Sequence, residues 1–513
     1  MEARDSPASS VPSSSLEALT EAQRLAEHIQ SPEQREVALA TVGSVWALWG
    51  NPARAHPLVD RISPNQDPFP QSPWGALLRA RAGLAYAYLG AQDSAVQRFG
   101  GALEKFKEVP AAARAGLSGA FCLSLSRAHE QMGDPRLVAL VVELGALEGS
   151  PSERVQAQGT LLQMELHQAH LEGARKLAQG LLDLLRSPHL LDEPALDRLV
   201  EFVISYVELT SDRGVLADLQ ERAFPLLGRP LLLKAQSLVG RLLREMGEAL
   251  RGERMLREAQ GDLPALKGIA DRVRIGLELA KLLAEDGNAP ATETLLEWTH
   301  EQLLPTSRPG QPSPFEEVLL RGRASAHASL GRLEELRADS EGWLQEESLP
   351  LRDSGLEFLV SRLGELAAEP ALLARRLQRL RERLESSAPE TFRRLDAEAE
   401  RSLRAQDLPE ARRSVVRAHR VALAYLAEMP NLAELWTTLR ELKTAFDQWD
   451  PRWGDRRLFL KDLDSAQEAL KLRDWRRLRM VLRRAQETLH QKERAATGPT
   501  ELPPRGESAQ RGG

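Results

Sequence analysis

The feature that most restricts the fold is a stretch of small and large residues around a turn, GLAYAYLGAQDSAVQRFGGAL at residues 83–103. It predicts two helices, from about 74 to 89 and from 93 or 94 to about 106. Gly90 would end the first helix because glycine takes the left-handed conformation without strain, and Asp93 would cap the second. Small residues would let the helices approach closely, with large residues beside the crossing. The defining positions are Gly83, Tyr86, Gly90, Ala95, Phe99 and Ala102.

The same pattern recurs along the chain, so the hairpin is a repeated unit. Expected turns fall at positions 50, 90, 133, 214, 247, 287 and 331, mostly 40 to 44 residues apart. A single hairpin buries only one face, and several must stack to build a continuous core. We therefore expect an array of hairpins over residues 16–350. Further copies are defined by Gly43, Trp46, Gly50, Ala55, Gly240, Gly247, Ala259, Pro264, Gly287 and Gly331.

These offsets resemble those of the tetratricopeptide repeat, a two-helix unit of about 34 residues. The resemblance implies a right-handed α-solenoid whose groove, lined by the first helix of each unit, binds a peptide or protein. The units here are longer than those of the family, and the tryptophan of the first helix is usually replaced. Related helical hairpins are one alternative. The other is that each glycine only ends a helix.

Composition favours an all-α protein, because Leu, Ala, Arg and Glu dominate and strand-like runs of β-branched residues are missing. Cys122 is the only cysteine, which excludes an intrachain disulfide and a cysteine-based metal site. The N-terminus lacks a secretory pattern and no apolar run approaches about 18 residues, so we expect a cytoplasmic protein without a membrane span. Arginine outnumbers lysine 58 to 10, a bias typical of GC-rich bacterial genomes.

Charge divides the chain: residues 351–513 carry 32 basic and 26 acidic residues, a net of +6, and residues 1–350 carry −12. We expect a basic helical extension over 351–490 and disordered tails at 1–12 and 495–513. The simplest interpretation of its arginines is a solvated face, an acidic protein partner ranks second and nucleic acid third. The candidate contacts to an anionic partner are Arg412, Arg413, Arg417, Arg420, Arg476, Arg477, Arg483 and Arg484.

Apolar residues in this extension predict helix packing. The segment LLARRLQRLRERLE places a stripe of leucines on one helix face, at 373, 377, 380 and 384. We expect the stripe to dock on a neighbouring helix, with a dimerising coiled coil as the alternative. Trp449 and Trp453 are expected to pack the ends of a hairpin, with a contact site as the alternative.

The sequence carries no recognisable catalytic motif: no phosphate loop, dinucleotide fingerprint, HExxH or GxSxG. His167 and His170 lie three residues apart on an expected helix, but no third ligand accompanies them. We therefore expect no enzyme, no cofactor and no metal. The leading hypothesis is a non-catalytic scaffold or adaptor in a bacterial signalling or regulatory pathway. The alternatives are a regulator that contacts nucleic acid or the transcription machinery through the arginine-rich helices, and an enzyme on a helical scaffold.

Overall fold

The structure is a computed structural model that describes residues 11–60, 69, 72–147, 151–303, 315–346, 348–384, 388–428, 432–449, 456–471 and 475–496. These residues form 23 α-helices, four short 3-10 helices and no strand, which confirms the all-α prediction. The tails predicted to be disordered, 1–12 and 495–513, lie almost entirely outside the described residues.

The chain divides into two compact units. Unit 1 comprises residues 1–383 and 388–423, and unit 2 comprises 384–387 and 424–513. The helix that begins at our expected boundary near residue 350, α18 (Leu349–Leu384), packs with helices from both ends of the preceding array and so belongs mostly to unit 1.

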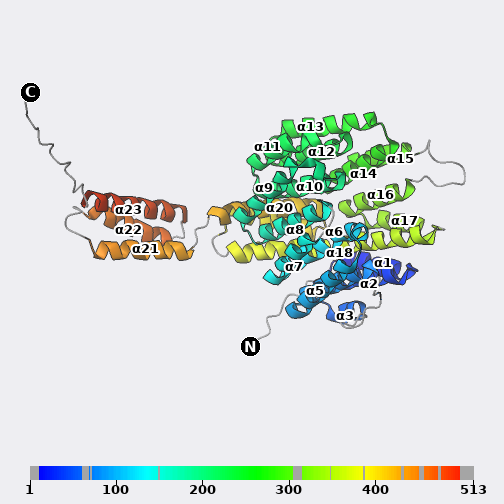
Figure 1. The fold of residues 1–513 in the computed structure, drawn as a ribbon, viewed down its shortest axis with the longest axis horizontal. Helices are drawn as coiled ribbons and strands as arrows, with labels where there is room; N and C mark the ends of the chain where they lie inside the picture. The colour runs from blue at the N-terminus through cyan, green and yellow to red at the C-terminus, as the bar shows by residue number, and fades with distance from the viewer. Residues whose placement is uncertain are drawn as a thin grey trace, which may run out of the picture. The chain divides into compact units, whose positions relative to one another are not determined.

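Unit 1 opens with α1 (Ser13–His28), and eight helix pairs follow (Figure 1). The first helices of the pairs are α2 (Pro32–Leu48), α4 (Pro73–Tyr88), α6 (Ala111–Met132), α8 (Pro151–His167), α10 (Glu193–Thr210), α12 (Arg229–Glu245), α14 (Ile269–Glu285) and α16 (Glu316–Leu330). The second helices are α3 (Pro52–Val59), α5 (Gln92–Glu108), α7 (Pro135–Ala146), α9 (Leu171–Asp183), α11 (Arg213–Arg222), α13 (Ala249–Asp262), α15 (Ala289–Glu301) and α17 (Leu333–Leu344). Each first helix packs on its own second helix and on the next first helix.

The turns inside the pairs use the left-handed backbone conformation. Six glycines have positive φ there, at positions 50, 90, 133, 247, 287 and 331. In two other pairs the left-handed residue is Ala169 or Ser211. The expected turn at Gly214 is therefore wrong: Ser211 makes the turn, and Gly214 lies inside α11. Asp93 is likewise not the cap of α5, because Ala91 occupies that position.

Small residues sit where paired helices cross. A Cβ atom on Gly83 would lie 2.9 Å from the ring of Phe99, and one on Gly43 would lie 2.7 Å from Val59. In the α12–α13 pair the backbones themselves meet, because a Cβ on Gly252 would lie 2.4 Å from the carbonyl oxygen of Gly240. These distances explain why the repeat pattern places glycine and alanine at the crossings.

The two ends of the series of pairs meet. α1 packs against α17, where Arg337 forms an ion pair with Glu17 at 3.5 Å. One apolar cluster contains residues of α1 to α4, of α16 and α17, and of α18. Within it, Trp343 of α17 is buried so closely against Gly355 of α18 that any side chain at 355 would overlap its ring. The helix α18 therefore joins the first pair to the last.

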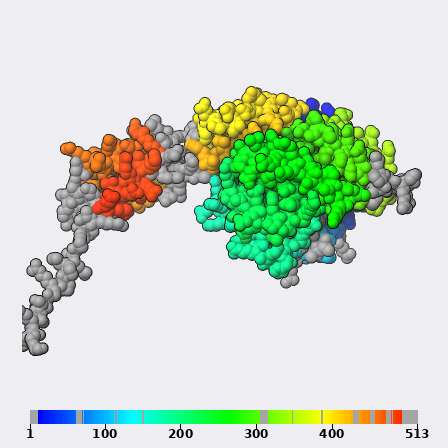
Figure 2. Space-filling model, turned by 90° about the horizontal axis from the view of Figure 1, so that it is seen from above, coloured from blue at the N-terminus to red at the C-terminus, as the bar shows by residue number. Residues whose placement is uncertain are grey.

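After α18 come α19 (Glu390–Arg404) and α20 (Leu408–Glu428), joined by a turn in which Gln406 has positive φ. The leucine stripe of α18 is buried at 373, 377, 380 and 384. Figure 2 shows one face of unit 1, on which the green residues of α12 to α15 form a continuous surface.

Unit 2 contains α21 (Leu432–Asp447), α22 (Arg457–Lys471) and α23 (Trp475–Ala496), which pack around a common apolar cluster. Trp449 packs on Phe459 with ring centroids 5.3 Å apart, so its side chain contributes to this cluster. Trp453 lies outside the described residues.

The close crossing of α12 and α13 predicts a specific effect of one methyl group. Gly252→Ala should lower the free energy of unfolding by about 2 kcal/mol or more, because the helices must separate. Gly180→Ala in α9 is the matched control: its Cβ would meet no atom within 4 Å. The control should be neutral or gain up to about 1 kcal/mol from helix propensity. Urea denaturation followed by circular dichroism measures both, and equal stabilities of the two variants would contradict the close approach.

Candidate functional site

Arginines of α18 and α20 contact the C-terminal ends of all eight first helices. Five of these ends present a backbone carbonyl oxygen to a guanidinium, namely Leu48, Glu130, Glu208, Asp286 and Ser329. The remaining three, at α4, α8 and α12, are contacted through Tyr88, Gln168 and Glu245. The arginines are Arg375, Arg379, Arg383, Arg412, Arg413 and Arg420. We call this set the arginine hub.

The hub matches the electrostatics of helix ends. The last carbonyls of a helix have no partner within the helix, and the helix dipole places partial negative charge there. A guanidinium supplies several donors and a positive charge at once. One such contact is worth about 0.3–1 kcal/mol when exposed and up to about 2 kcal/mol when partly buried. The hub therefore fixes the register of the first helices against α18 and α20.

Glu130, near the end of α6, is the most heavily bonded acid of the hub. Arg376 donates to both of its carboxylate oxygens, at 2.9 and 3.3 Å, and Arg379 lies 3.4 Å away. Burial alone would raise the pKa of Glu130, but the charges of Arg376, His167 and Arg379 hold that pKa far below its usual range. Glu130 is therefore an ionised anchor for α18.

The arginines that we predicted in α20 point inward, with one exception. Arg412 pairs with Glu369 of α18 at 2.6 Å, Arg413 donates to the Asp286 carbonyl at 2.9 Å, and Arg420 donates to the Glu208 carbonyl at 2.8 Å. Arg417 is exposed. These contacts differ from the solvated face that was the simplest expectation.

The predicted arginines of α23 differ from those of the hub. Arg477 pairs with Glu468 at 2.8 Å, Arg483 pairs with Glu487 at 3.1 Å, and Arg484 pairs with Asp462. The guanidiniums of Arg483 and Arg484 remain largely exposed. The side chain of Arg476 lies outside the described residues.

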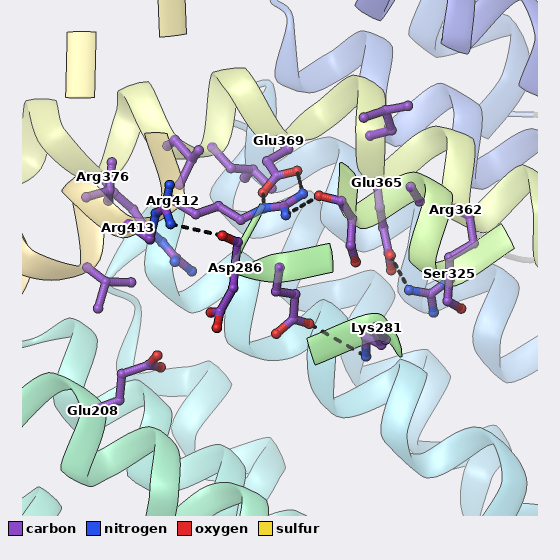
Figure 3. A pocket seen from close by; sticks show the side chains of 18 of the residues that line it. Glu208, Lys281, Asp286, Ser325, Arg362, Glu365, Glu369, Arg376, Arg412 and Arg413 are labelled. Carbon is purple, nitrogen blue, oxygen red and sulfur yellow. Dashed lines mark hydrogen bonds and ion pairs between the residues drawn. The ribbon is translucent and has the colours of Figure 1, made fainter. Parts of the chain in front are cut away.

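A cavity of about 460 Å³ lies between α18, α20 and the ends of α6, α10, α12, α14 and α16. Figure 3 shows Glu365 and Glu369 of α18 on one side, with Asp286 and Lys281 across from them. Its lining contains equal numbers of acidic and basic residues, seven of each, and no aromatic side chain lines it within the described part of the chain. This composition suits a polar ligand and excludes ring stacking as a means of binding.

Most charges around the cavity are paired. Arg241 lies 2.6 Å from Glu285 and 3.7 Å from Glu208, and Arg362 lies 2.8 Å from Glu365. Burial raises the pKa of Glu208 and that of Asp286, because the charged form of each carboxyl is poorly solvated there. A cationic or hydroxyl group entering the cavity would find acceptors there.

Two histidines lie next to the hub, His419 buried and His167 partly buried. Burial lowers the pKa of His167 to about 4, although Glu130 lies 3.9 Å away. Burial also lowers the pKa of His419 to about 3, reinforced by Arg376 and His167 and opposed by Glu130. His170 precedes α9 without a side-chain capping hydrogen bond, and its Nδ1 lies 3.4 Å from a carboxylate oxygen of Glu165. The described residues contain no group of three potential metal ligands.

The predicted repeat positions belong to the interior of unit 1 and not to the cavity. Trp46, Ala55, Ala95, Phe99, Ala102 and Ala259 are buried, Tyr86 is half-buried and bonded to Asp60, and Pro264 follows α13 in a 3-10 turn. Sequence reasoning missed the arginines at 375, 376, 379 and 383. The available signal was their spacing of three and four residues on one helix, which we interpreted as solvation.

No protein-family model, curated protein or solved structure gives a significant match to this chain. Among the described residues, no helix has the length and apolar character that crossing a bilayer requires. Cys122 is buried, and burial raises the pKa of its thiol to about 12, so it is an inert apolar side chain.

Neutralising Glu130 should destabilise unit 1 strongly. Glu130→Gln leaves Arg376 and Arg379 without a buried counter-charge, which should lower the free energy of unfolding by about 3 kcal/mol. Glu334→Gln is the control, since Glu334 pairs with Arg337 at 2.7 Å on the surface, and it should cost less than about 1 kcal/mol. Chemical denaturation compares the two, and similar losses would contradict the anchoring role of Glu130.

His419 should make unit 1 less stable in acid. The unfolded chain takes up a proton near pH 6.5, whereas the folded pKa is about 3, so stability falls as the pH drops below about 6.5. Between pH 7 and 5 this effect amounts to about 2 kcal/mol. His419→Gln should therefore lose about 2 kcal/mol less than the unmodified chain over that interval. Urea denaturation at both pH values measures the difference, and an unchanged pH dependence would refute the assignment.

Proposed function

We propose that the chain is a non-catalytic protein-interaction scaffold whose unit 1 is a tetratricopeptide-like α-solenoid. The eight stacked pairs, the left-handed residues in their turns and the small residues at their crossings support this assignment. We further propose that it acts by recruitment in the bacterial cytoplasm, within a signalling or regulatory pathway. The paired state of the carboxylates around the cavity supports a non-catalytic role.

One observation carries the proposal: the ends of the first helices bind arginine-bearing helices. In this chain the bound helices are its own α18 and α20, held by guanidiniums at the helix ends and by an apolar cluster along α18. An amphipathic helix laid on an apolar surface is a common mode of peptide recognition. We therefore propose that the ligand of this scaffold is an amphipathic, arginine-containing helix, and that α18 and α20 hold the same surface within the chain.

Nucleic acid is a weaker candidate for the ligand, because the arginines that would bind it already have partners within the chain. Three of the four arginines predicted in α20 are bonded to Glu369, to the Asp286 carbonyl and to the Glu208 carbonyl. Guanidiniums engaged in this way must first exchange partners before they neutralise phosphates. A low-salt gel shift with the full chain tests this alternative directly.

Cleavage of the intact chain tests the recognition of helices. A protease site placed at position 347, between α17 and α18, allows the folded protein to be cut into 1–347 and 348–513. The two pieces should stay together on gel filtration because the hub and the apolar cluster hold them. Arg375→Glu combined with Arg379→Glu should release the C-terminal piece, whereas Arg483→Glu combined with Arg484→Glu on α23 should not.

The decisive negative result is separation of the unmodified pieces while 1–347 keeps its helical circular dichroism. That outcome would mean that the array has no affinity for a helix that is not covalently attached, and the scaffold mechanism would be wrong.

A further inference from the structure

Two arginines beside the hub have no partner. Arg81 of α4 and Arg127 of α6 form no hydrogen bond and no ion pair with any residue of the described ranges. Arg81 is only 8% exposed, and its Nε is buried without an acceptor. A buried guanidinium without a bonded anion is costly, because its lost hydration is replaced only in part.

The two guanidiniums act on each other. Burial lowers the pKa of Arg81, and the positive charge of Arg127 lowers it further. The charges of Glu365 and Glu357 oppose this effect, but neither carboxylate forms an ion pair with Arg81. Glu365 is instead bonded to Arg362 at 2.8 Å. Two like charges that line one small cavity without a bridging anion repel, and a bound oxyanion would satisfy both.

Space for one oxygen atom of such a group exists beside them. Arg81 and Arg127 line a small cavity of about 20 Å³, together with the hydroxyl-bearing residues Thr41, Ser44 and Ser361. This volume admits one water-sized group, such as a single oxygen atom of an oxyanion, so the rest of the anion would lie toward the larger cavity. Arg127 and Glu365 also line the 460 Å³ cavity, so the two spaces adjoin. Among the described cations that line the larger cavity, Arg127 is the one left without a bonded partner.

We propose that Arg81 and Arg127 bind the oxyanion, a phosphate or carboxylate, of a small polar molecule whose remaining part occupies the larger cavity. Guanidiniums bind both kinds of anion through paired N–H donors. The acids that line the larger cavity favour hydroxyl or amine groups on the rest of the ligand, and the lack of aromatic lining among the described residues disfavours a planar base. A scaffold with this site would bind a metabolite inside the same hub that holds α18.

Calorimetric titration of the full chain with inorganic phosphate tests the oxyanion site. Binding should be saturable, and sodium chloride at matched ionic strength should not reproduce it. Arg127→Gln should weaken phosphate binding at least about tenfold. It should not lower the stability measured without phosphate, because it removes a repulsion from Arg81. Arg417→Gln is the matched control, an exposed arginine of α20, and it should leave the affinity unchanged within about twofold.

Acetate in a parallel titration distinguishes a carboxylate from a phosphate ligand: the anion that binds more tightly identifies the class. O-phosphoethanolamine should bind at least as tightly as inorganic phosphate, since its amine would reach the acids of the larger cavity, and weaker binding would overturn that part of the assignment. The oxyanion site itself is overturned if neither anion binds beyond chloride, or if Arg127→Gln binds phosphate as tightly as the unmodified chain.

Discussion

The bond between a guanidinium and the C-terminal end of a helix is the interaction on which unit 1 depends. Eight first helices end beside α18 and α20, and each end meets an arginine directly or through a neighbouring side chain. Stacking alone fixes each pair only against its neighbours. The hub adds contacts from two central helices to the whole series, so that distant pairs share the same supports.

The fold class and most of the turns inside the helix pairs could be predicted from sequence, because both depend on local properties. The glycines at 50, 90, 247, 287 and 331 have the left-handed backbone that their role as turns requires. Where the turn residue is not glycine, as at Ser211, the nearby Gly214 drew the prediction to the wrong position. A left-handed serine carries no compositional signal, since only its backbone differs.

The hub and the cavity could not be predicted for a different reason. Arg375 and Leu48 are 327 positions apart, and Arg420 and Glu208 are 212 apart. A helical period shows that arginines share a face, but it does not show what that face meets. Most arginines in proteins are exposed, so we expected these side chains to be solvated. Here buried acids such as Glu130 supply counter-charges that allow the arginines to lie inside the protein.

Contacts between the two ends of the series can form only late in synthesis of the chain. Asp353 accepts hydrogen bonds from the backbone N–H groups of Gln30 and Ser31, and Trp49 donates to the Ala367 carbonyl, across 318 to 323 positions of chain. A ribosome releases the N-terminal hairpins first, and these hairpins lack their covering helix until α18 has been translated. Nascent chains shorter than about 370 residues therefore expose apolar side chains that α18 covers in the full chain. A chain that ends before α18 leaves these side chains in solvent, where they favour aggregation.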